Sequence, residues 1–247
     1  MYYEPFLGSG AVLGALAPTR AVASDGLKPL IESWRTLKEN PQRLLSWYRT
    51  RWERFQRHDR REVYEGIKAR FNREPNPGDL LFLSRTCYGG VIRFRKDGYM
   101  STPIGVHNPI SPEAMAKRIG IWRKRTTGTQ FVWCSSEETI DHAKAGDLIY
   151  CDPPYSDTQS ILYGSQEFSL QRLFEAIGRA KRRGVFVALS IDGQKKSGDK
   201  VCNVPIPEGL FKRSIVINCG RSMLRRFQMQ GKTLESEVVA DRLLLTW

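Results

Sequence analysis

The stretch DLIYCDPPYSD, residues 147–157, ends a hydrophobic run with an acid, two prolines and an aromatic residue. Proline cannot donate a ladder hydrogen bond, and it favours extended geometry in the residue before it. A strand at residues 148–151 should therefore end at Asp152. The simplest interpretation is a strand followed by a rigid turn. The alternative is a functional site at the strand end, where backbone carbonyls stay free of sheet pairing.

Strand-like and helix-like segments alternate on both sides of this stretch. The N-terminal sequence MYYEPFLGSGAVLGAL predicts a short strand, a glycine turn and a small-residue helix. Such alternation is typical of an α/β protein with a parallel sheet. Further strands are expected at residues 20–25, 129–134, 148–151, 185–192, 213–218 and 241–247, and helices at 27–40, 112–124, 136–146 and 169–184.

Residues 41–125 interrupt this alternation. Residues 41–86 are rich in arginine and aromatic residues with helical spacing, and EPNPGD breaks them; residues 87–105 carry glycines and a KDG turn, which favour a β-hairpin or loop. We therefore expect one α/β unit made of residues 1–40 and 126–247, which the resemblance described below implies to be the catalytic domain. Residues 41–125 would form an inserted, mainly helical subdomain that contains the hairpin.

Composition narrows the class of protein. The chain has 247 residues, enough for a full core, and its 40% hydrophobic and 11% aromatic content indicates a globular protein. No apolar run approaches the ~20 residues that span a bilayer, so we expect a soluble, intracellular protein without membrane contact. Five scattered cysteines without a C-x-x-C pair, and three isolated histidines, predict neither a disulfide framework nor a metal site.

The net charge points to a polyanionic partner. The formal charge is +13, and phosphates are the usual partners of so many lysines and arginines. A single basic cluster is often only a solvated helix face. Four clusters without balancing acids favour nucleic acid: RTRWERFQRHDRR, KRIGIWRKR, RAKRR and RSMLRRF.

Three features are expected at strand ends, where open parallel sheets bind ligands. The turn FLGSG, residues 6–10, allows close backbone approach to a ligand, although many such strings are only tight turns. Asp25 ends the second strand, where an acid can bind a ribose or simply cap a helix. Asp152 ends a later strand. Their joint occurrence in one sheet predicts a ligand site.

The combination of YYEPFLGSG, SD closing the next strand, and YCDPPY resembles the alpha group of DNA adenine-N6 methyltransferases, the Dam-type enzymes. The segment SRTCYGGVIRFRKDGYMSTPIG and the last two strands are also similar, so the resemblance covers nearly the whole chain. It implies a Rossmann-like methyltransferase sheet that uses S-adenosylmethionine. It also implies double-stranded DNA as the partner and a bacterial or phage origin with a cytoplasmic location. Nothing demands a dimer, and we expect a monomer.

The resemblance also implies roles for individual residues. The cofactor would be bound by Asp25 at the ribose and, around the methionine moiety, by Glu4, Pro5, Phe6, Gly8 and Gly10. Tyr155 would stack on an adenine flipped out of the duplex. The Asp152 carboxylate and the Pro153 carbonyl would accept the hydrogens of the adenine amino group, and Pro154 would help to keep the turn rigid.

The expected hairpin would read DNA. Tyr88, Arg93 and Arg95 lie between glycines, in a segment of a size that could enter a groove or fill the space of a flipped base. Arginine contacts guanine edges often and phosphates more often still. We expect Arg93 to contact DNA, with no base assigned.

Two departures from the family pattern fall on cofactor binding. The Gly-Gly-Lys segment that usually precedes the first strand does not occur in this sequence. After the strand at 129–134, residues 135–137 are Ser-Ser-Glu where an acid followed by phenylalanine is usual, with Glu137 or Glu138 as substitutes. A catalytically impaired DNA-binding remnant of the same fold is therefore an alternative. Methylation of another planar amide or amine, in RNA or protein, is a third hypothesis.

Overall fold

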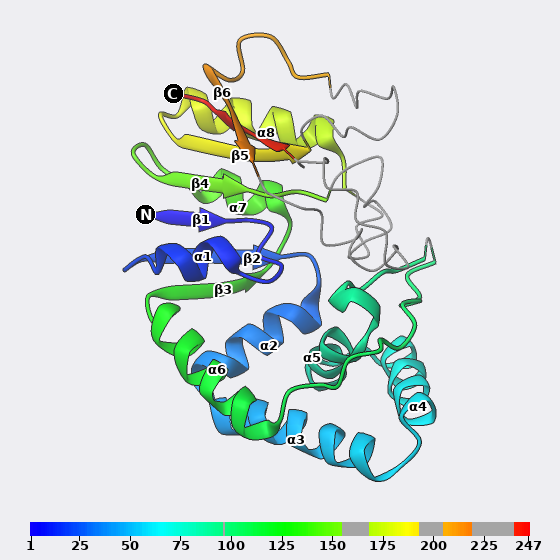
Figure 1. Cartoon of the computed structure of the whole chain (residues 1–247). Helices are drawn as coiled ribbons and strands as arrows, with labels where there is room; N and C mark the ends of the chain where they lie inside the picture. Colours follow the sequence, from blue (N-terminus) through cyan, green and yellow to red (C-terminus); the bar gives the residue numbers. More distant parts are fainter. Residues whose placement is uncertain (96, 155–167, 193–204, 219–239) are drawn as a thin grey trace.

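The computed structural model describes residues 1–95, 97–154, 168–192, 205–218 and 240–247. Its centre is a seven-stranded sheet of order β3-β2-β1-β4-β5-β7-β6 (Figure 1). Strands β1 to β5 are parallel, and β7 runs antiparallel between β5 and β6. The strands are β1 (Tyr2–Glu4), β2 (Ala21–Asp25), β3 (Thr129–Trp133), β4 (Leu148–Cys151), β5 (Phe186–Asp192), β6 (Arg213–Asn218) and β7 (Ala240–Leu245). The predicted α/β class with a Rossmann-like sheet is confirmed.

The helices begin where the sequence places capping residues and prolines. Asn40, Asn76 and Ser111 each accept a hydrogen bond from a backbone N–H in the first helical turn, and a proline follows each of them. The helices are α1 (Ala11–Leu16), α2 (Lys28–Glu39), α3 (Pro41–Arg57), α4 (Arg60–Arg73), α5 (Pro77–Thr86), α6 (Pro112–Arg125), α7 (Ser136–His142) and α8 (Leu170–Arg182), with a 3₁₀ turn at Tyr88–Gly90. In the described ranges, no helix is long and apolar enough to cross a membrane.

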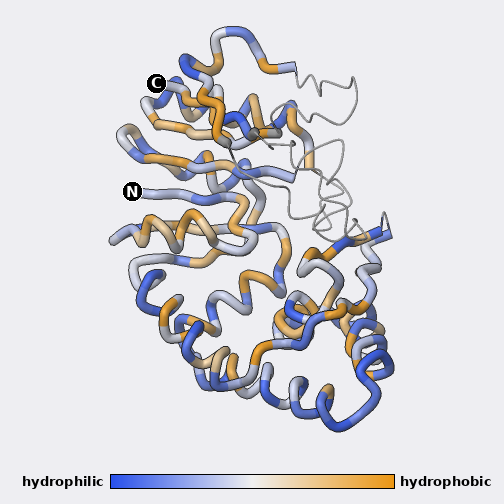
Figure 2. Tube along the Cα trace, in the orientation of Figure 1, coloured by the Kyte–Doolittle hydropathy of each residue, from blue (hydrophilic) through white to orange (hydrophobic). Residues whose placement is uncertain are grey.

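Two hydrophobic clusters cover the two faces of the sheet. Successive strand residues point to opposite faces, so Tyr2 packs in one cluster and Tyr3 in the other. The cluster with Tyr3 includes residues of α7 and α8. The cluster with Tyr2 continues into the helices of residues 41–125, where Tyr48 and Phe82 are fully buried. These helices gather beyond the β3 side of the sheet, and α3 and α4 are largely hydrophilic along their length (Figures 1 and 2). The division into domains stays a prediction.

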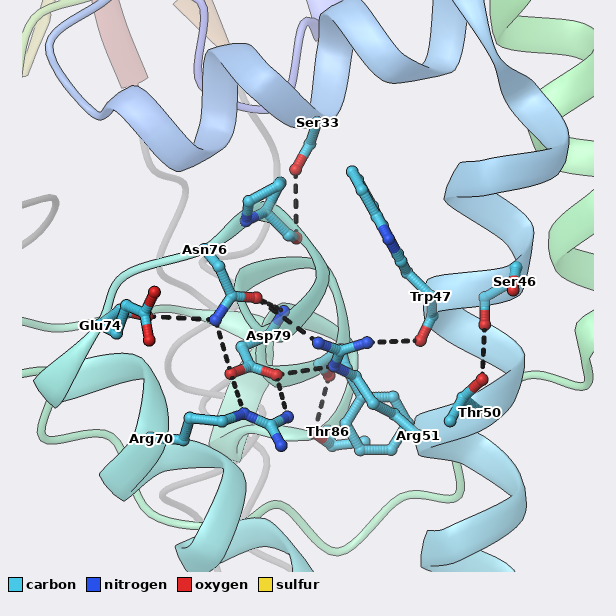
Figure 3. A network of polar contacts seen from close by, with 12 residues as sticks. Ser33, Ser46, Trp47, Thr50, Arg51, Arg70, Glu74, Asn76, Asp79 and Thr86 are labelled. Atoms are coloured by element: carbon cyan, nitrogen blue, oxygen red, sulfur yellow. Dashed lines mark hydrogen bonds and ion pairs between the residues drawn. The ribbon is translucent and has the colours of Figure 1, made fainter.

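A buried carboxylate joins α3, α4 and α5. Asp79 is fully buried and accepts hydrogen bonds from Arg51 Nε at 2.7 Å, Arg70 Nε at 2.7 Å and Asn76 Nδ2 at 2.8 Å (Figure 3). Burial alone would raise the pKa of Asp79, but these donors outweigh it and the pKa lies below its usual value. The three helices are therefore joined by one buried network of ion pairs and hydrogen bonds around Asp79.

The segment predicted as a hairpin doubles back on itself without forming regular strands. It contains two isolated antiparallel bridges, Cys87 with Ile104 and Phe94 with Met100. Asn72 of α4 holds its far end, since Asn72 accepts from the Met100 N–H at 2.6 Å and donates to the Met100 carbonyl at 3.1 Å. The segment is thus anchored to α4, with its turn around Gly98.

Candidate active site at the carboxyl edge of the sheet

Strand β1 is the centre of the candidate site. It lies between β2 and β4 and is parallel to both, with Tyr2 paired to Ala21 on one side and to Leu148 on the other. The three strands therefore end at one edge of the sheet, which we call the carboxyl edge (Figure 1). The glycine turn, Asp25 and Asp152 follow these strands, so the structure brings the three features together.

The glycine turn and Asp25 hold one another. Gly8 donates its N–H to Asp25 Oδ2 at 3.0 Å, and Leu27 donates to Oδ1 at 2.9 Å. Burial raises the pKa of Asp25, and these two hydrogen bonds oppose that shift. The bond to Leu27 goes to the residue before α2 rather than to its first turn, so Asp25 supports the turn more than it caps the helix.

The two glycines are needed for different reasons. Gly8 and Gly10 both have positive φ, 47° and 66°, which disfavours other residues. A Cβ on Gly10 would lie 2.9 Å from the Trp34 ring, whereas a Cβ on Gly8 would meet nothing within 4 Å. Gly10 is therefore packed, and Gly8 faces open space. Pro5 is buried beside them, and the half-buried Phe6 meets Phe168 edge to face at 5.7 Å.

Glu4 ends β1 with its side chain inside the protein. Its exposed fraction is 2%, and Tyr2 donates its hydroxyl to Glu4 Oε2 at 2.6 Å. Burial is the main reason that the pKa of Glu4 rises to about 7; the charge of Asp152 adds to the rise, and hydrogen bonds from Tyr2 and the Leu13 N–H oppose it. Glu4 and Asp152 are therefore electrostatically coupled across neighbouring strands.

The acid-proline-proline stretch follows β4. Asp152 is exposed at the strand end, Pro153 is buried and Pro154 is half-buried. Burial, with the charge of Asp152 as the next cause, raises the pKa of the preceding Tyr150 to about 12. Tyr155 lies outside the described residues, so its predicted stacking role stays a prediction.

Comparison with known proteins decides the class. The sequence profile of the D12 class N6 adenine-specific DNA methyltransferases matches residues 1–194. The chain belongs to this family. Its membership confirms the predicted enzyme class and DNA as the substrate, and it favours the enzyme over a DNA-binding remnant.

Similar proteins are named as methyltransferases or DNA adenine methylases. The type II methyltransferase M1.LlaDCHI of Lactococcus lactis subsp. cremoris is 26% identical over 206 residues, which cover 76% of this chain and 71% of the relative. The retron Ec67 DNA adenine methylase of Escherichia coli is 30% identical over 164 residues, 64% and 55% of the two chains. A DNA adenine methylase of Vibrio cholerae is 28% identical over 200 residues, 76% and 70% of the two chains.

The residues that we expect to read DNA lie in the segment of residues 87–105, which Asn72 anchors to α4. Tyr88 is 38% exposed, and the side chains of Arg93 and Arg95 are exposed while their neighbours Ile92 and Phe94 are buried. Arg95 is paired with Asp97 inside the segment and lies over the Tyr99 ring at 5.1 Å. No ion pair of the described residues involves Arg93, and its contact with DNA stays a prediction.

Two arginines near this segment were not singled out as a pair in the sequence, although Arg118 belongs to the basic cluster KRIGIWRKR. Arg118 of α6 is exposed, and Arg85, in the last turn of α5, is exposed as a residue while protein packs around its guanidinium. Desolvation, followed by the charge of Arg118, lowers the pKa of the Arg85 guanidinium, so the two cations lie close together. Within the described ranges neither has an ion pair with an acid. Their pairing gave no signal in the sequence, because Arg85 and Arg118 are far apart along the chain and come together only in the fold.

The stretch after β3 departs from the family pattern in a specific way. Ser135 caps α7 by accepting from the Glu138 N–H at 3.1 Å. The Glu137 carboxylate receives Arg172 of α8 at 3.0 Å and the Ser136 hydroxyl at 2.9 Å. Glu137 therefore joins α7 to α8. Because its carboxylate is already engaged there, Glu137 is a weaker candidate to replace the acid that the family usually has near the cofactor. No group of three or more potential metal ligands occurs among the described residues.

Proposed function

We propose that this chain transfers a methyl group from S-adenosylmethionine to the N6 amino group of an adenine flipped out of duplex DNA. The observation that carries the proposal is the adjacency of β1 and β4. It sets the acid-proline-proline stretch beside the glycine turn, so a methyl donor and an acceptor nitrogen can meet at the carboxyl edge.

The chemistry requires fixed hydrogen-bond acceptors. The lone pair of an adenine amino group is delocalised into the ring, which makes the nitrogen a weak nucleophile. Asp152 is exposed at the strand end, and Pro153 is held by burial, so a carboxylate and a rigid carbonyl are available to accept the two amino hydrogens. Such acceptors pull the nitrogen toward tetrahedral geometry and stabilise the positive charge that develops on it.

The chain's own residues fit the cofactor. Gly8 faces open space at the carboxyl edge, where a methionine moiety can lie against the backbone. Each Asp25 oxygen accepts one backbone N–H and retains a lone pair for a ribose hydroxyl. When bound, S-adenosylmethionine supplies an electrophilic methyl group on a positively charged sulfur, and Glu4 and Asp152 are acids with which such a charge is compatible.

DNA binding is supported by three arginines of the inserted region. Arg93 projects from the anchored segment, and Arg85 with Arg118 forms a pair of cations that a phosphate would neutralise. Extruding the target adenine costs a few kcal/mol, and Tyr155 would stack on the extruded base.

The test is methyl transfer to DNA by the whole chain. We expect labelled methyl groups from S-adenosylmethionine to enter unmethylated duplex DNA as N6-methyladenine, with Asp152→Asn lowering the rate at least 100-fold. The matched control is Glu39→Gln, which changes an exposed acid at the end of α2 and should leave the rate unchanged. Transfer by Asp152→Asn at the rate of the unmodified chain would contradict the proposed mechanism.

A second experiment separates the enzyme from the DNA-binding remnant. Calorimetry should detect binding of S-adenosylmethionine in the absence of DNA. DNA binding with a steep salt dependence but no detectable cofactor binding would favour the remnant. Sequencing of modified adenines in DNA from cells that express the chain would then report the recognition site.

A further inference from the structure

Among the residues that the structure describes, Glu4 is a buried acid without a basic partner. Its exposed fraction is 2%, and the groups facing it are the Tyr2 hydroxyl, the Leu13 N–H of α1 and the acid Asp152. No hydrogen bond or ion pair of the described residues brings a lysine or arginine to it. A buried carboxylate normally acquires a cation or keeps a proton, since an unpaired buried charge is costly.

The titratable neighbours of Glu4 in the described part of the chain do not supply that cation. On β1 the neighbour is Tyr2, and on β4 they are Tyr150 and Cys151, followed by Asp152. The charges of Glu4 and Asp152 raise the pKa of both Tyr150 and Cys151, after burial as the main cause, so these two stay neutral. Glu4 and Asp152 are thus two acids at one edge, of which the buried Glu4 is the more costly to ionise.

We propose that Glu4 holds a proton in the cofactor-free protein and releases it when a cofactor with a positive charge binds at the carboxyl edge. This inference rests on the proposed function, because it requires S-adenosylmethionine to bind there. Its consequence is specificity: S-adenosylmethionine carries a sulfonium charge, and the product S-adenosylhomocysteine is neutral at the same sulfur. Glu4 would then favour the donor over the spent product by charge alone.

The expected pH dependence follows from the sign of the coupling. With the pKa of Glu4 at about 7 in the free protein, proton release opposes binding of the donor below pH 7 and no longer does so above it. The ratio of the affinities for S-adenosylmethionine and S-adenosylhomocysteine should therefore rise about tenfold between pH 6 and 8. The amino and carboxylate groups that both ligands share cancel in this ratio.

The experiment is titration calorimetry of the whole chain with both ligands, in buffers of different ionisation enthalpy. At pH 7, S-adenosylmethionine should release roughly half a proton more than S-adenosylhomocysteine. An analogue with a protonated amine in place of the sulfonium should behave like the donor. Glu4→Gln should bind both ligands with a ratio that no longer changes with pH, whereas Glu39→Gln should behave like the unmodified chain.

The outcomes separate this inference from the proposed function. If both ligands bind and their affinity ratio is independent of pH in the unmodified chain, the role of Glu4 is overturned and the proposed function stands. If neither ligand binds, the cofactor assignment fails and the role of Glu4 fails with it. Should Glu4→Gln not fold, the ratio in the unmodified chain and the amine analogue still decide the question.

Discussion

Two buried acids in this protein have opposite surroundings. Asp79, among α3, α4 and α5, receives Arg51, Arg70 and Asn76, and its pKa lies below the usual value. Glu4, at the carboxyl edge, receives a hydroxyl and one backbone N–H and faces a second acid, and its pKa rises to about 7. The first acid is compensated by cations within the protein, whereas no cation of the described residues compensates the second.

This difference distinguishes a buried acid that serves the fold from a buried acid that can serve ligand binding. A compensated carboxylate contributes stability and needs no ligand, whereas an uncompensated one lowers stability and can be relieved by a cation from outside. The pH dependences must also have opposite signs. The contribution of Asp79 is lost as pH falls, and the penalty for ionising Glu4 grows as pH rises.

Asp79→Asn should give the largest effect. It leaves the two guanidinium groups without their shared anion, and removing one partner of a buried ion pair costs about 3 to 5 kcal/mol. Because Arg70 is 41% exposed, we expect the lower end of that range. Denaturant unfolding at pH 7 measures the loss.

The control for this prediction is Asp97→Asn, which removes an exposed acid paired with the exposed Arg95 and should cost under about 1 kcal/mol. Since the pKa of Asp79 is lowered, the difference between the unmodified chain and Asp79→Asn should be constant above pH 5. It should shrink as the pH falls below about 4, the ordinary range of an aspartate. Equal losses for the two variants would remove the contrast between the acids.

Glu4→Gln should alter the pH dependence of stability in the direction opposite to that of Asp79→Asn. The pKa of Glu4 is about 7 in the folded chain, and its ordinary value is 4.5. Between pH 4.5 and 7 the folded state therefore keeps a proton that the unfolded chain releases. The stability of the unmodified chain therefore falls through this window by up to about 3 kcal/mol, a loss that the glutamine avoids. Unfolding of both proteins from pH 5 to 8 tests this, and parallel curves would contradict it.

Much of the fold was predictable from the sequence, because strands and helices here have local causes. Hydrophobic runs such as residues 148–151 and 186–191, and caps followed by proline, fall where the structure has strands and helix starts. The strand-end residues Asp25 and Asp152 were predictable for the same reason.

Pairings over long separations were not predictable. Glu4 was expected only as a cofactor contact, because its raised pKa comes from burial and, to a smaller extent, from Asp152 on the neighbouring strand, and neither is visible in the sequence. Asp79 was not identified either, since Arg51 and Arg70 come from two other helices. A partial signal existed in the string NPGD: Asn76 and Asp79 bond reciprocally as a helix cap, which marks Asp79 as an ordered position.

Gly78→Ala tests how tightly the compensated acid is held. A Cβ at this position would lie 2.8 Å from Arg51 Nη2, so the guanidinium must move and its hydrogen bond to Asp79 must weaken. We expect a loss of about 1 to 2 kcal/mol in the free energy of unfolding. Gly66→Ala in α4 is the matched control, because its Cβ meets nothing within 4 Å and should stabilise the helix by up to about 1 kcal/mol. A gain in both variants would show that Arg51 is free to shift.

Tyr2→Phe should give the smallest effect and the sharpest test of Glu4. The Tyr2 hydroxyl donates to Glu4 and lowers its pKa, so removing the hydroxyl should raise that pKa further. Stability should still begin to fall near the ordinary pKa, but the upper end of the pH window should move upward, by an amount that corresponds to about 1 kcal/mol for one lost hydrogen bond. Tyr3→Phe is the control on the same strand, since Tyr3 packs in the cluster on the other face and should leave the titration of Glu4 unchanged. If Tyr2→Phe and Tyr3→Phe shift the profile equally, the hydroxyl does not tune Glu4, and burial and Asp152 alone govern the proton.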